Sequence, residues 1–147
     1  PTFLAKYLVE NAPATDDFDY APWLVANLSL DAFPVQRAGV PLAWDNVIHD
    51  SDALGYVVAT HQSLRIHQPQ TVFTFYYPLA GASAKAERTR LLNTDWKTWT
   101  EFIFTDLSRP HPEIREIVSN VDIMRWGHAM VRPRPGFMWS DTRQRFL

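Results

Sequence analysis

The stretch Thr71-Val-Phe-Thr-Phe-Tyr-Tyr77 consists of β-branched and aromatic residues, which predicts a β-strand that ends at Pro78. After Gly81 the spacing of the apolar residues becomes helical. Two helices are expected in succession, one over residues 84–92 with Ser83 as its cap, and one capped by Asn93 or Thr94 and ending before residue 110. The chain therefore passes from strands to helices at this point, which decides its fold class. The apolar stripe of the second helix consists of Trp96, Trp99, Phe102, Ile103 and Leu107.

Four further elements are predicted on the N-terminal side of this strand. A short helix within residues 1–11 ends before Pro13, and apolar residues alternate with polar or smaller ones over residues 23–30, as in a half-buried strand. Two more strands, residues 42–49 and 55–62, are joined by Asp50-Ser-Asp52. Because short oxygen-bearing side chains favour tight reversals, we expect these two strands to form a hairpin.

The segment after Pro110 predicts a third helix and a last strand. His111 and Pro112 fit the cap and the first turn of the helix, and residues 121–126 alternate as in a strand. Strands that are grouped, followed by helices that are grouped, favour an α+β fold. We expect an antiparallel or mixed sheet of about five strands with helices packed on one face. The length of 147 residues fits one domain, residues 1–147.

Composition and charge argue against several classes of partner. The formal net charge of −2 gives no broad positive field, so nucleic acid is not an expected partner. Five arginines gather after residue 120, and we favour a solvated or flavin-side surface over an RNA-binding strip. No apolar run approaches the roughly 20 residues that span a bilayer. The absence of cysteine excludes disulfides and thiolate chemistry.

The sequence contains no motif that predicts catalysis or metal binding. Its five glycines are too far apart for a Gly-rich dinucleotide turn or a P-loop, so the chain lacks a loop of its own for a pyrophosphate. No two histidines have the spacing of a helical zinc motif. The sequence leaves one alternative open, in which His49 and His61 bind the same ligand across the predicted hairpin. No Gly-x-Ser-x-Gly elbow occurs. No catalytic residue and no metal ligand are therefore predicted.

Aromatic residues make up 14% of the chain and concentrate on the predicted strands. Core packing explains most of them, but some could line a cavity for a flat or hydrophobic ligand. If they share one face of the sheet, they form a flat apolar wall. The residues concerned are Trp23, Trp44, Tyr56, Phe73, Phe75, Tyr76 and Tyr77.

Three stretches resemble flavin-dependent oxidoreductases. Val121-Asp-Ile-Met-Arg-Trp-Gly-His-Ala-Met-Val-Arg-Pro-Arg-Pro-Gly136 is similar to the segment of flavin-containing amine oxidases and related FAD-dependent dehydrogenases that leads out of the substrate domain. There, a strand with an Arg-Trp pair and a tail of small residues and proline return the chain toward the flavin. Tyr20-Ala-Pro-Trp-Leu-Val-Ala-Asn-Leu28 and Pro41-Leu-Ala-Trp-Asp-Asn-Val47 resemble a bacterial branch of FAD- or NAD-binding oxidoreductases. The matching residues of the first segment are Arg125, Trp126, Ala129, Pro133 and Gly136.

The resemblance implies that FAD belongs to another part of the same polypeptide. In that family a Gly-rich FAD-binding turn precedes this region and a second flavin-contacting segment follows it, and this sequence has neither. We therefore expect a substrate-binding domain excised from a larger FAD-dependent protein, without activity or bound FAD of its own. Its partners would be the missing FAD-binding domain and a small-molecule substrate, an amine or a related compound that gives a hydride to the flavin. Exposed apolar surface on the lone domain would favour self-association.

The resemblance and the predicted sheet together suggest the residues of the site. Two other hypotheses remain beside it, both without redox activity: a self-contained small-ligand module with a closed internal pocket, and an interaction domain whose aromatic face docks a partner protein. The expected flavin-side residues are Trp126, His128 and Met130, and the expected substrate-side residues are Trp44, Asn46, His61 and Tyr76.

Overall fold

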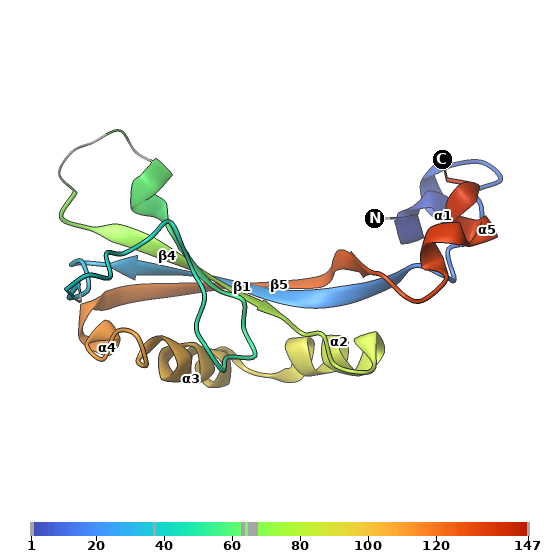
Figure 1. Ribbon diagram of the computed structural model, residues 1–147. Coiled ribbons are helices and arrows are strands. Elements are labelled where there is room, and N and C mark those ends of the chain that lie inside the picture. Colours follow the sequence, from blue (N-terminus) through green and yellow to red (C-terminus); the bar gives the residue numbers. More distant parts are fainter. Residues whose placement is uncertain (1, 37, 63, 65–67, 147) are drawn as a thin grey trace.

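The computed structural model describes residues 2–36, 38–62, 64 and 68–146, without the side chains of residues 3 and 61. Its centre is a five-stranded antiparallel sheet with the strand order β2-β3-β4-β1-β5. The helices α2, α3 and α4 lie along one face of this sheet (Figure 1). The α+β fold with helices on one face is thereby confirmed. The strands are β1 (Asp19–Leu30), β2 (Asp45–Asn46), β3 (Gly55–Val58), β4 (Thr71–Pro78) and β5 (Val118–Arg132), and the three helices are α2 (Ala84–Asn93), α3 (Trp96–Leu107) and α4 (Ile114–Ile117).

The core lies between the sheet and these helices. Along β4, burial alternates residue by residue, so that Phe73, Phe75 and Tyr77 are buried while Thr74 and Tyr76 are only half-buried. The period of two in the sequence thus puts one set of side chains under the helices and the other set on the opposite face. The largest fully buried side chains of the core are Phe73, Phe75, Leu24, Leu28, Leu30, Leu79, Leu91, Ile103, Leu107, Ile114 and Val58.

The two long helices begin at side-chain caps. Ser83 Oγ accepts a hydrogen bond from the amide of Ala86 at 3.3 Å, as the sequence predicts for α2. Asp95, not Asn93 or Thr94, caps α3, and its Oδ1 accepts from the amide of Thr98 at 2.7 Å. The prediction was wrong because α2 runs on through Asn93, which leaves only residues 94 and 95 between the two helices.

The lengths of the strands differ from the prediction in both directions. Residues 42–49 contribute only the two-residue β2, and β3 ends at Val58, after which residues 59–62 form the 3₁₀ helix η2 (Ala59–Gln62). The predicted hairpin does form, with Asn46 opposite Tyr56. β1 begins four residues earlier than expected, at Asp19, and β5 continues past Trp126 to Arg132, because each strand supplies the other with a partner. Long-range pairing of this kind has no local signal in the sequence.

Beyond the end of β4, β1 and β5 continue as a two-stranded ribbon to a separate cluster at the ends of the chain (Figure 1). Phe18 packs edge-on against Phe137 and Phe146, with ring centroids 5.2 and 5.3 Å apart. At the base of the cluster Asp19 contacts Arg134 at 2.8 Å. Burial opposes ionisation of Asp19, but Arg134 and Arg132 hold its pKa below the ordinary value. The cluster contains η1 (Thr2–Leu4), α1 (Ala5–Leu8), η3 (Phe137–Trp139) and α5 (Asp141–Gln144).

Candidate functional site

The face of the sheet turned away from α2, α3 and α4 is named the open face. Of the described helices, η2 lies on that side of the sheet, near the end where β4 begins, and the helices of the terminal cluster lie beyond the other end (Figure 1). On each strand, alternating residues that are half-buried or exposed point to this face. The ladder registers place these residues opposite one another on neighbouring strands. The open face consists of Trp23, Val25, Asn27 and Ser29 on β1, Asp45 on β2, Val57 on β3, Val72, Thr74, Tyr76 and Pro78 on β4, and Asn120, Asp122, Met124 and Trp126 on β5.

Three aromatic side chains gather at one end of the open face and are named the aromatic band: Trp23, Tyr76 and Trp126. Trp23 lies opposite Trp126 in the β1–β5 ladder. On its other side, the ring of Trp23 meets that of Tyr76 edge-on, with centroids 6.4 Å apart. Trp126 keeps 55% of its surface exposed. Three adjacent strands therefore combine into one apolar surface that the helices do not cover.

The other end of the open face is polar. Thr74 Oγ1 donates a hydrogen bond to Asn27 Oδ1 at 2.9 Å, and Asn120 Nδ2 donates to Asp122 Oδ2 at 2.8 Å. Asp122 on β5 and Asp45 on β2, which pairs with Val57, are the described residues of the open face that carry a formal charge. The face thus offers ring surfaces and amide or hydroxyl groups to a ligand. Such groups bind and orient a molecule, whereas a general acid or base would need a titratable group directed at the reacting atom.

A bulge in β5 separates Trp126 from His128. Trp23 pairs with Trp126 and Ala21 with Met130, so residues 127–129 stand opposite Pro22 alone. Proline is tolerated at such a place because it has no N–H to give to the ladder. The bulge explains how β1 can include Pro22 and begin at Asp19, although the predicted strand begins only at Trp23.

Arg88 of α2 holds the bulge from the helix side. Its Nε donates to the carbonyl of Gly127 at 2.8 Å, and a terminal nitrogen donates to the carbonyl of Tyr20 at 3.4 Å. The ring of His128 lies edge-on to that of Tyr20, with centroids 5.8 Å apart. Burial, and to a smaller extent the charge of Arg88, lowers the pKa of His128 below its usual value. His128 therefore lies near Arg88 and Tyr20, and not in the aromatic band.

The structure brings only some of the predicted site residues together. Trp126 and Tyr76 lie on the strands on either side of Trp23, which the sequence placed in the aromatic set but not in the site. Alternation along residues 23–30 was the available signal for Trp23, since it sets Trp23 on the face opposite to Leu24. Met130 is 56% exposed and pairs with Ala21 in the ribbon.

Two of the remaining predicted residues, Trp44 and Asn46, lie at the opposite edge of the sheet. Trp44 immediately precedes β2 and is 55% exposed, and Asn46 belongs to β2. With three strands between β2 and β5, four strand spacings or about 19 Å separate these edges. Asn46 Nδ2 donates to the carbonyl of Ala43 at 2.8 Å. The side chain of His61 lies outside the described residues, and its backbone belongs to η2.

The predicted aromatic wall is divided between the two faces of the sheet. Tyr56, Phe73, Phe75 and Tyr77 are buried on the helix-covered side, and the rings of Tyr56 and Phe73 stack with centroids 4.6 Å apart. Only Trp23 and Tyr76 of the strand residues in that set reach the open face. Strand periodicity separates neighbours such as Tyr76 and Tyr77, so a run of aromatic residues cannot form one wall.

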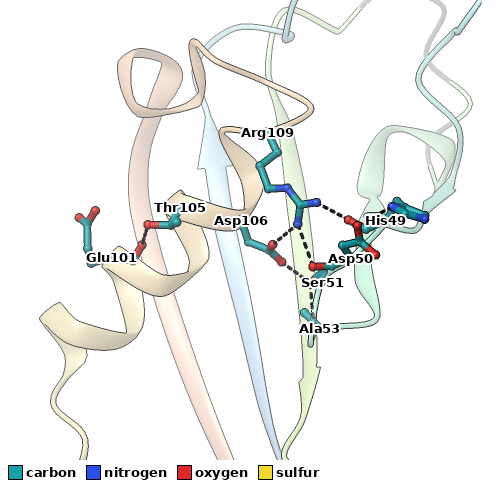
Figure 2. Close-up of polar contacts among 8 residues, drawn as sticks. All are labelled: His49, Asp50, Ser51, Ala53, Glu101, Thr105, Asp106 and Arg109. Atoms are coloured by element: carbon teal, nitrogen blue, oxygen red, sulfur yellow. Dashed lines mark hydrogen bonds and ion pairs between the residues drawn. The ribbon is translucent and has the colours of Figure 1, made fainter.

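A polar network joins α3 to the turn between β2 and β3 (Figure 2). The carboxylate of Asp106 accepts from Ser51 Oγ at 2.5 Å and from Arg109 at 3.3 Å. Arg109 also donates to the carbonyls of Asp50, at 3.2 Å, and His49. The His49 side chain is 91% exposed and contacts Asp50 at 3.1 Å. Serine, aspartate and histidine therefore do not form a catalytic triad, and the network anchors a turn.

The arginines that concentrate late in the chain are engaged by their own protein. Arg125 donates to the carbonyl of Leu92 at 2.8 Å, and Arg143 to that of Met138 at 3.0 Å. Arg132 and Arg134 both contact Asp19. These contacts give four of the arginines structural roles within the domain.

No protein-family model and no curated protein matches the chain. Over the residues that the structure describes, no group of three or more histidine or acidic side chains is arranged to hold a metal ion. Within the same residues, no helix is long and apolar enough to cross a bilayer.

Proposed function

We propose that this chain is the substrate-binding domain of a FAD-dependent oxidoreductase of the amine oxidase type. The open face is the wall of a cavity that the FAD-binding domain closes. The observation that carries the proposal is the aromatic band, three rings on adjacent strands in a face that α2, α3 and α4 leave uncovered. Flat rings of this kind hold a flat or hydrophobic substrate by area and by ring stacking.

In this proposal FAD and the aromatic band have different roles. When bound, FAD supplies the redox chemistry by accepting a hydride from a carbon next to nitrogen, or from an activated C–C unit. Trp23, Tyr76 and Trp126 orient the substrate and exclude water. The chain has no Gly-rich turn for a pyrophosphate, which fits a protein in which the dinucleotide is held by another domain.

The test uses the protein produced from its complete gene. We expect the flavin absorption bands in its visible spectrum and anaerobic bleaching of these bands by amine substrates. Trp126→Ala should retain the flavin and slow its reduction by about tenfold or more, since an aromatic contact that orients the substrate is lost. Trp139→Ala is the matched control, because Trp139 is 82% exposed in the terminal cluster.

Three results would overturn the proposal. A purified protein without flavin would remove its basis. Reduction at the same rate in Trp126→Ala and Trp139→Ala would separate the open face from the reaction. A flavin-free protein that buries Trp126 against another polypeptide would assign the aromatic band to protein interaction instead.

A further inference from the structure

A concave site lies at the β2 edge, on the helix-covered side of the sheet. It has a volume of about 360 Å³ and is enclosed by the loop before β2, by Tyr56 of β3 and by Pro110 and His111 after α3. This volume is near the lower end of the range of small-molecule sites. The apolar part of its wall consists of Pro34, Val35, Val40, Pro41, Leu42 and Val47.

The floor of this pocket is a buried polar pair. Tyr56 is 3% exposed and His111 is 7% exposed, and the phenol oxygen lies 2.6 Å from His111 Nε2. Burial raises the pKa of Tyr56 to about 12, so the phenol is neutral at physiological pH. The pair can share its hydrogen bond in either direction, depending on the tautomer of His111. The phenol can then accept from a ligand hydroxyl, or donate to a ligand carbonyl.

We propose that this pocket binds a neutral, ring-sized organic molecule whose single hydroxyl or carbonyl group is directed at the Tyr56–His111 pair. The walls offer apolar surface to the body of the ligand. Among the described lining residues only Asp45 has a formal charge, and it is exposed at the rim. Asp45 pairs with Val57 and therefore belongs to the open face and not to the Tyr56 side. A charged group placed among the apolar walls would lose its hydration without compensation.

The pocket is separate from the aromatic band. Tyr56 and Val57 are consecutive residues of β3, so their side chains point to opposite faces, and only Val57 belongs to the open face. Ligand binding at the β2 edge therefore does not rest on the proposed redox function. Absence of flavin would leave this proposal intact, and loss of the pocket would leave the flavin spectrum intact.

Ligand-observed saturation-transfer NMR on the purified protein tests the proposal with three probes that share one ring: benzyl alcohol, toluene and benzoate. We expect saturable binding of benzyl alcohol, about fivefold weaker binding of toluene, which has no polar group, and the weakest binding for benzoate. Failure of benzyl alcohol to saturate, or tighter binding of benzoate, would overturn the proposal.

Two variants assign the binding to this pocket. Ala43→Phe adds a ring to an exposed lining position and should abolish saturable binding, whereas Ala86→Phe, at an exposed position of α2, should not. Tyr56→Phe should remove the preference for benzyl alcohol over toluene, with Tyr76→Phe on the open face as its control. Binding of benzyl alcohol that is equally tight in Ala43→Phe, or a preference that survives Tyr56→Phe, would refute the assignment.

Discussion

Trp23 and Trp126 lie directly opposite each other in the β1–β5 ladder, next to the bulge at which residues 127–129 face Pro22 alone. The bulge lets the ladder resume with Ala21 opposite Met130, and Arg88 fixes it from α2. The geometry of the aromatic band thus depends on a contact between the sheet and a helix on its other face.

Arg88→Met should loosen the bulge. The variant loses the hydrogen bonds to the carbonyls of Gly127 and Tyr20, and we expect the free energy of unfolding to fall by about 1–2 kcal/mol in urea denaturation. The pKa of His128 should rise in an NMR titration because the charge of Arg88 helps to lower it, although burial will keep it depressed. Lys85→Met, at an exposed position of α2, is the control. An unchanged His128 pKa would contradict the assigned role of Arg88.

His128 should make stability depend on pH. Its folded-state pKa is lowered, mainly by burial, from the ordinary 6.5. As the pH falls below 6.5, the unfolded chain takes up this proton before the folded protein does, so stability declines until the lowered pKa is passed and then levels off. His128→Gln should reduce this decline in urea denaturation curves measured at several pH values. A decline of the same size in His128→Gln would contradict this assignment.

Gly55 and Gly39 should respond very differently to alanine, although both have positive φ. A Cβ at Gly55 would lie 1.9 Å from the carbonyl oxygen of Asn46 on the paired strand, whereas a Cβ at Gly39 meets no atom within 4 Å. We expect Gly55→Ala to cost about 3 kcal/mol or more, or to prevent folding. Gly39→Ala should cost only about 1 kcal/mol, from its backbone conformation. If Gly55→Ala and Gly39→Ala had equal midpoints of urea denaturation, the close approach of β2 to β3 at Gly55 would be wrong.

Asp106→Asn should release the turn between β2 and β3. The carboxylate is nearly buried and accepts from both Ser51 and Arg109, and loss of its charge weakens both bonds. We expect a loss of about 1–3 kcal/mol and faster hydrogen exchange of the Leu54 amide, which donates to the carbonyl of Tyr76. Asp52→Asn, at an exposed position of the same turn, should change neither. Unaltered exchange in Asp106→Asn would rule out the anchoring role.

Local patterns were sufficient for several elements. The aromatic and β-branched run of β4, the cap of α2 at Ser83 and the pairing of β2 with β3 all follow from neighbouring residues. The Tyr56–His111 pair was not predicted, because His111 had been placed as a helix cap and its partner lies far away along the chain, on β3. The polar floor of the pocket exists only after β3 and the end of α3 are packed together.

The sequence by itself determined the α+β class, the order of strands and helices, and the absence of a pyrophosphate-binding glycine turn, since propensity, periodicity and turn chemistry act within a few residues of one another. Only the tertiary structure decided how far β1 and β5 extend, which aromatic residues meet, and which face of the sheet stays uncovered. These properties depend on strand register and on the side to which the helices pack. Both are fixed by contacts between residues that are distant along the chain and have no local signature.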